Sequence, residues 1–74
     1  MTAVALPWES WRAVVAVLRA KALPHMRAHA DELEQQLERH PPDQAMVTLH
    51  LTDDLFLRSY NWAGWQLGIP LPVD

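Results

Sequence analysis

Three residues whose side chains can bind a metal ion share one flank of a predicted helix. His25, His29 and Glu32 are spaced i, i+4 and i+7, which places them on the same side of an α-helix. Two imidazoles and a carboxylate can coordinate a zinc ion and leave one position open. The same residue types are ordinary on a solvent-facing helix side, so the pattern predicts either a metal site or a plain polar flank.

The other reactive residues lack the spacing that catalysis requires. No serine lies in a Gly-x-Ser-x-Gly turn, and the only glycines, Gly64 and Gly68, cannot form a phosphate-binding loop. Asp53 and Asp54 are adjacent acids, but the start of a helix explains acidic residues at this place. The sequence therefore predicts a protein that is not an enzyme and that uses no cofactor.

Tryptophan is the most distinctive residue type, and it occurs in two pairs. Trp8 and Trp11 are spaced i, i+3, and so are Trp62 and Trp65. Such rings either fill a small core or form the centre of a binding surface. Since Trp62 and Trp65 lie away from the main apolar face of their predicted helix, we expect Trp65 to contact a partner.

An apolar stripe runs through the first half of the chain. Its members recur at steps of three or four residues: Trp11, Val15, Leu18, Ala22, Met26, Ala30, Leu33 and Leu37. The stripe stays in phase across Pro24, and no loop of the usual length for a helical hairpin interrupts it. The pattern favours one long N-terminal helix from about Trp8 to Arg39, kinked near Pro24, with two separate helices as the alternative.

A helix of that length predicts a second chain. It would extend about 48 Å, and the remaining residues could hardly cover its apolar side. We therefore expect a homo-oligomer, most simply a homodimer, or a complex with another protein. The predicted interface residues are Trp11, Val15, Leu18, Met26, Leu33, Leu37 and Trp65.

The second half begins with a short segment of uncertain type. At 46–51 the apolar residues Val47, Leu49 and Leu51 alternate with polar ones, which predicts a short strand, with a helical turn as the alternative. A strand here needs a partner. The candidates are residues 2–6, the same strand of a second subunit, or a different protein.

A C-terminal helix is predicted at 53–66. Thr52 can cap its start, and Gly68 is suited to its end. Beyond it, we expect residues 69–74 to lie extended against the body.

The length, the charge and the composition of the chain limit which folds and functions are expected. The chain has 74 residues, which fits a single small helical domain spanning 1–74. Its net charge is −3 with scattered basic residues, so nucleic-acid binding is disfavoured. No signal peptide and no apolar run of membrane-spanning length are present, so we expect a cytoplasmic protein without membrane contact.

These features together predict a mainly α fold and a binding role. The favoured function is a non-enzymatic protein–protein interaction module or a small oligomeric subunit. The alternatives are a small dimeric regulator that contacts nucleic acid through a strand pair, and a metal-binding helical protein.

Overall fold

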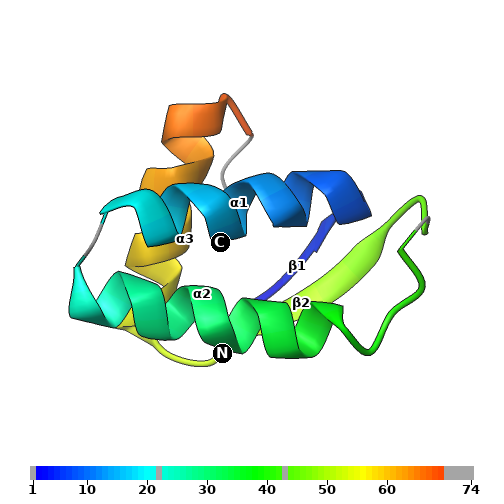
Figure 1. The fold of residues 1–74 in the computed structure, drawn as a ribbon, viewed down its shortest axis with the longest axis horizontal. Coiled ribbons are helices and arrows are strands. Elements are labelled where there is room, and N and C mark those ends of the chain that lie inside the picture. The colour runs from blue at the N-terminus through cyan, green and yellow to red at the C-terminus, as the bar shows by residue number, and fades with distance from the viewer. Residues whose placement is uncertain (1, 22, 43, 70–74) are drawn as a thin grey trace.

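Three helices and a two-stranded sheet make up the fold (Figure 1). The computed structural model describes residues 2–21, 23–42 and 44–69. In chain order the elements are β1 (Thr2–Leu6), α1 (Trp8–Lys21), α2 (Pro24–Leu37), β2 (Val47–Leu51) and α3 (Asp54–Leu67). Within these ranges, no helix is long and apolar enough to cross a lipid bilayer. The mainly helical fold is confirmed, and residues 70–74 of the predicted extended tail lie outside the described residues.

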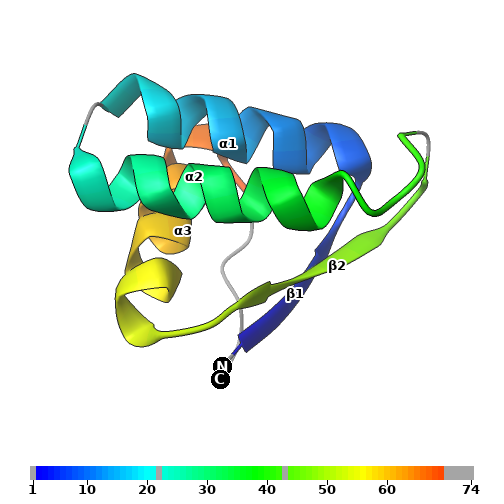
Figure 2. The ribbon, with the colours of Figure 1, turned by 60° about the horizontal axis from the view of Figure 1, so that its bottom comes forward.

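The first half of the chain is a helical hairpin. Helices α1 and α2 lie side by side, separated in sequence only by residues 22 and 23 (Figures 1 and 2). Pro24 is the first residue of α2, and Leu23 before it is extended, with φ −92° and ψ 136°. A residue before proline avoids the helical region. Of the two predicted alternatives, two helices are therefore confirmed, and the continuous helix kinked at Pro24 is wrong.

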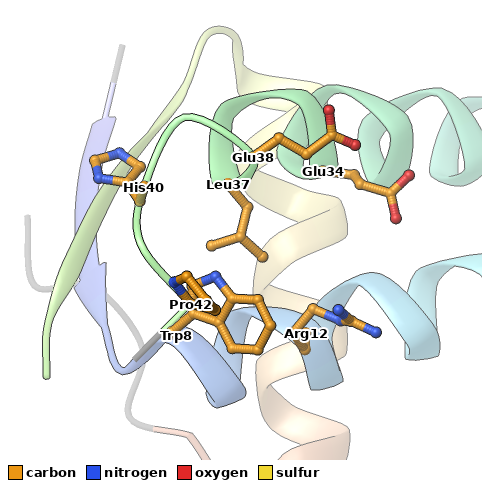
Figure 3. A pocket seen from close by; sticks show the side chains of 7 residues that line it. All are labelled: Trp8, Arg12, Glu34, Leu37, Glu38, His40 and Pro42. Carbon is orange, nitrogen blue, oxygen red and sulfur yellow. The ribbon is translucent and has the colours of Figure 1, made fainter. Parts of the chain in front are cut away.

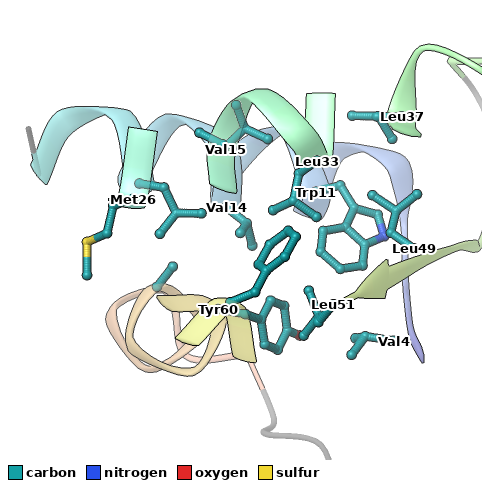
Figure 4. Packing of buried hydrophobic residues seen from close by; sticks show 14 of the residues in the cluster. Val4, Trp11, Val14, Val15, Met26, Leu33, Leu37, Leu49, Leu51 and Tyr60 are labelled. Atoms are coloured by element: carbon teal, nitrogen blue, oxygen red, sulfur yellow. The ribbon is translucent and has the colours of Figure 1, made fainter. Parts of the chain in front are cut away.

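The hairpin changes what covers the apolar stripe. Once folded back, both halves of the stripe face the strand pair and α3 (Figure 4). Trp11, Leu18 and Leu33 are fully buried within the single chain, and Met26 is only 8 % exposed. The whole molecule measures 29 × 25 × 22 Å, much shorter than the predicted helix. The chain covers the stripe by itself, so the reason for expecting a second chain there no longer holds.

The predicted strand at 46–51 is present as β2. It pairs antiparallel with β1, and Val4 lies opposite Leu49. The alternation works as expected, because Val47, Leu49 and Leu51 point into the core while the residues between them are exposed. Residues 2–6, one of the three predicted partners, supply the second strand, so β2 does not require a strand from another chain.

Helix α3 is closed at both ends by local hydrogen bonds. The carboxylate of Asp53, rather than the predicted Thr52, accepts a bond of 2.8 Å from the backbone N–H of Phe56. At the other end Gly68 has a left-handed φ of 71°, and the N–H of Ile69 donates to the carbonyl of Gly64 over 2.8 Å. This is a Schellman ending, which favours glycine. The predicted role of Gly68 is confirmed.

Trp11 joins three elements in the centre of the core. Its indole Nε1–H donates a buried hydrogen bond of 2.8 Å to the carbonyl of Val47. Its ring lies 5.6 Å from the ring of Tyr60, measured between centroids. Helix α1 is thereby fixed to β2 and α3 at one point. Because the bond is buried, its geometry is enforced by the cost of leaving polar atoms unpaired.

A surface ion-pair cluster links the two helices of the hairpin. The guanidinium of Arg19 lies 2.8 Å from carboxylate oxygens of Asp31 and Glu34. These hydrogen bonds raise the pKa of Arg19, and they lower the pKa of Glu34. All three side chains are well exposed, so water and salt weaken the pairs. The cluster orients the hairpin, whereas buried apolar contacts stabilise it.

The central position of Trp11 can be tested by substitution. Trp11→Phe removes the buried donor to Val47 and part of the core volume, so we expect the free energy of unfolding to fall by about 2–4 kcal/mol. The matched control is Trp65→Phe, an exposed position where the change should stay within about 0.5 kcal/mol. Denaturant titration measures both, and equal effects of the two substitutions would contradict the assigned role.

Candidate functional site

The four tryptophans differ in their exposure to solvent. Trp11 is fully buried, Trp8 and Trp62 are half-buried, and Trp65 leaves 72 % of its surface exposed. Burying an indole ring is strongly favourable, so an open ring contributes little to the fold that holds it. Trp65 is the most exposed large apolar side chain in the described part of the chain, and it is the strongest candidate for a contact residue.

Trp65 belongs to the side of α3 that is turned away from the core. Phe56, Tyr60 and Ala63 are fully buried and define the inner side. The residues that follow Leu55 at steps of three, seven and ten are spaced along the opposite side of the helix, where Trp62 is half-buried and still packs partly against the core. We call this the outer face, and it consists of Leu55, Arg58, Trp62 and Trp65. Leu55 is 49 % exposed, so the outer face has apolar surface at both ends.

Basic side chains flank these apolar groups. Lys21, the last residue of α1, places its ammonium group 5.3 Å from the centroid of the Trp62 ring. Arg58 is exposed on the outer face itself. Lys21 beside Trp62, and Arg58 exposed on the same face as Trp65, give this surface a basic and apolar character that suits apolar groups bordered by carboxylates.

A hollow of about 270 Å³ lies between the start of α1 and the end of α2 (Figure 3). Trp8 and Leu37 give it an apolar lining. Its remaining lining residues are Arg12, Glu34, Glu38, His40 and Pro42. This volume would hold only a small group, such as one side chain of a partner.

Most polar groups of this hollow are already engaged. The guanidinium of Arg12 lies 5.2 Å from the centroid of the Trp8 ring. Glu34 accepts hydrogen bonds from Arg19, and His40 bonds to Gln44 over 3.1 Å. A ligand would have to compete with these contacts. The hollow is therefore a weaker candidate than the outer face of α3.

A histidine and a serine form a buried pair between α2 and α3. His29 Nδ1 and Ser59 Oγ are 2.9 Å apart, and the His29 ring stacks on Phe56 with 4.4 Å between centroids. Burial lowers the pKa of His29 below its ordinary 6.5, and the His25 charge acts in the same direction, whereas Asp53 and Glu32 oppose the shift. Histidine and serine can together make a nucleophile and its base.

Access to solvent decides what this pair does. Ser59 is 2 % exposed and His29 is 9 % exposed. Three hollows on the surface of the described residues are lined by other residues and include neither His29 nor Ser59. A nucleophile must reach its substrate, so the geometry favours a structural role in holding α2 against α3. One feature of the sequence could have indicated this pair, because His29 and Ser59 are each a polar residue on an otherwise apolar helix face.

The predicted metal ligands are not brought together in the described structure. Among the described residues, no group of three histidine, cysteine or acidic side chains is placed to hold a metal ion. The rings of His25 and His29 are 6.0 Å apart between centroids, and His29 is turned toward Ser59 and Phe56. Helical spacing predicted a shared flank for His25, His29 and Glu32, but packing draws His29 into the core.

The predicted interface residues divide into two groups. The six from the apolar stripe form part of the core cluster, where the chain's own elements cover them: Trp11, Val15, Leu18, Met26, Leu33 and Leu37. Trp65 alone remains on the surface. The hairpin at Pro24 is the cause, because it folds one half of the stripe back over the same core as the other.

The buried histidine makes stability depend on pH. Because the pKa of His29 is lowered in the folded state, its neutral form stabilises the fold above about pH 6.5, and this contribution is lost as the pH falls toward the lowered pKa. In the double variant His29→Phe, Ser59→Ala, the free energy of unfolding should fall less between pH 7.5 and pH 5. Thermal or denaturant unfolding at several pH values measures this difference.

A control separates His29 from the other histidines. His50→Gln changes an exposed ring whose residue bonds to Gln36 only through its backbone, so this variant measures the effect of replacing a histidine that lies outside the core. An unchanged pH dependence in the double variant would show that His29 is not the group responsible.

Comparison with known proteins gives no relative for this chain. No protein-family model, no curated protein and no solved structure matches it. What the chain does must therefore be inferred from its own surfaces, of which the outer face of α3 carries the clearest indication of a contact.

Proposed function

We propose that this chain is a non-enzymatic protein-interaction domain whose partner docks on the outer face of α3. The observation that carries the proposal is the 72 % exposure of Trp65. Tryptophan and arginine are the residue types that contribute most to binding energy at protein interfaces. Both occur on this face, with Arg58 seven residues before Trp65 and therefore two helical turns away.

The support beneath this face favours tight binding. On its inner side α3 is held by the fully buried Phe56 and Tyr60, and both helix ends are closed by local hydrogen bonds. A rigid helix loses little conformational entropy when it binds. Trp65 is thus presented on a fixed scaffold, as a binding anchor should be.

The distribution of reactive groups favours binding over catalysis. Ser59 is buried against His29, and in the Trp8 hollow Arg12 lies over the Trp8 ring while Glu34 is paired with Arg19. The partner that fits the outer face offers an apolar recess for the indole and carboxylates near Arg58 and Lys21. Such a surface belongs to another protein more readily than to a nucleic acid, whose phosphates need a denser set of basic residues.

Site-specific crosslinking in the native host tests the proposal. A photoreactive amino acid at the exposed Gln66, beside Trp65, should give a discrete crosslinked protein. The additional change Trp65→Ala should abolish this product, because loss of a central tryptophan weakens binding by about 30-fold or more. Unchanged thermal stability of the variant would show that the fold is intact.

A second position supplies the matched control. Gln35 is also an exposed glutamine, but it lies on α2. The same photoreactive group there should not give the product. A crosslinked protein that forms equally from both positions, or that persists after Trp65→Ala, would contradict docking on this face.

A further inference from the structure

The two edges of the small sheet differ in whether a side chain of the described residues bonds to their backbone groups. At the outer edge of β2, the backbone N–H and carbonyl of His50 both bond to the side-chain amide of Gln36, each over 2.9 Å. Gln36 thus takes the place of a neighbouring strand at this position. An unpaired strand edge invites pairing with other chains, and a covering side chain prevents it.

These two bonds also indicate which residues of β1 direct their backbone N–H and carbonyl groups away from β2. His50 lies opposite Ala3, and the backbone groups of His50 point away from β1. In an antiparallel pair both members of such a position direct their N–H and carbonyl groups outward, and the pattern repeats every second residue. Ala3 and Ala5 therefore turn their backbone groups toward the edge of β1 that faces away from β2.

Nothing in β1 protects this edge. Among residues 2–21, 23–42 and 44–69, no hydrogen bond reaches the outward groups of Ala3 and Ala5. The strand contains no charged residue and no proline, which are the usual means of blocking an edge. Both alanine side chains are exposed and small, so a second strand could approach closely.

The sequence of β1 is suited to pair with itself. We propose that two copies of the chain associate through antiparallel pairing of their β1 strands, about a two-fold axis at Val4. Ala3 then lies opposite the partner's Ala5, and Ala5 opposite the partner's Ala3. All the outward N–H and carbonyl groups of these alanines gain a partner, and the two sheets become one four-stranded sheet.

The side chains agree with this register. On the inner side of the sheet Val4 would meet the partner's Val4, and Thr2 would meet the partner's Leu6. Leu6 is only partly buried in the single chain, so the pairing would cover more of its apolar surface. No like charges face each other along the strand. A two-fold arrangement of identical surfaces is also the commonest way in which proteins form dimers.

Cysteine crosslinking tests both the dimer and its register, because the chain has no cysteine of its own. Ala3→Cys and Ala5→Cys are prepared as separate variants, one of them tagged. Mixed under mild oxidation, they should form a disulfide, since the paired residues would be about 5.5 Å apart between Cα atoms. Each variant alone should form little disulfide, because the cysteines of its two copies would be too far apart in the dimer.

Solution mass gives an independent measurement. Sedimentation over a range of concentrations should show species of up to twice the 8.5 kDa of one chain. Ala5→Pro removes one outward N–H and should shift the chain to monomer, whereas Ala5→Ser keeps this group and should remain dimeric. If Ala5→Pro fails to fold, the disulfide pattern alone tests whether two copies pair through β1.

Several results would overturn the proposal. A monomer at all concentrations would do so, as would equal disulfide formation in the mixed and separate samples. A chain that dimerises only after removal of residues 70–74 would show that its own C-terminal residues occupy the edge. The proposal is independent of the docking role of α3, because Trp65→Ala should leave the disulfide pattern unchanged.

Discussion

The fold depends on one buried contact, the hydrogen bond from the indole of Trp11 to the carbonyl of Val47. Trp11 lies on α1 and Val47 begins β2, so the bond joins the helical hairpin to the strand pair. Tyr60 packs against the same indole from α3. A small chain has room for few such contacts, and this one brings the helical hairpin, the strand pair and α3 together.

The closure of the hairpin determines which surfaces remain for binding. It buries the described residues of the apolar stripe inside the molecule, so these residues offer no surface to a partner. Two features outside this core are suited to a partner, the exposed ring of Trp65 and the backbone edge of β1 that faces away from β2. One is an apolar anchor on a rigid helix, and the other is a row of hydrogen-bonding groups. They lie on different elements, and one chain could use both at once.

Local patterns predicted the elements, but they could not predict how the elements meet. The alternation at Val47–Leu51 favoured the strand over a helical turn, and the glycine at 68 indicated the end of α3. The stripe across Pro24 was misleading, because apolar spacing stays in phase whether a helix continues or folds back after two residues. The contact of His29 with Ser59 joins residues 30 apart, and helix periodicity carries no information on such a pair.

The chain covers the described residues of its apolar stripe by itself, and Trp65 is the most exposed of its four tryptophans. Fluorine NMR of the 5-fluorotryptophan-labelled protein, with a paramagnetic agent in the solvent, measures the exposure of each ring separately. We expect the Trp11 signal to stay sharp at every protein concentration, and the Trp65 signal to be broadened in the free chain. A Trp11 signal that becomes exposed on dilution would contradict this expectation, because a second chain would then be needed to cover the stripe.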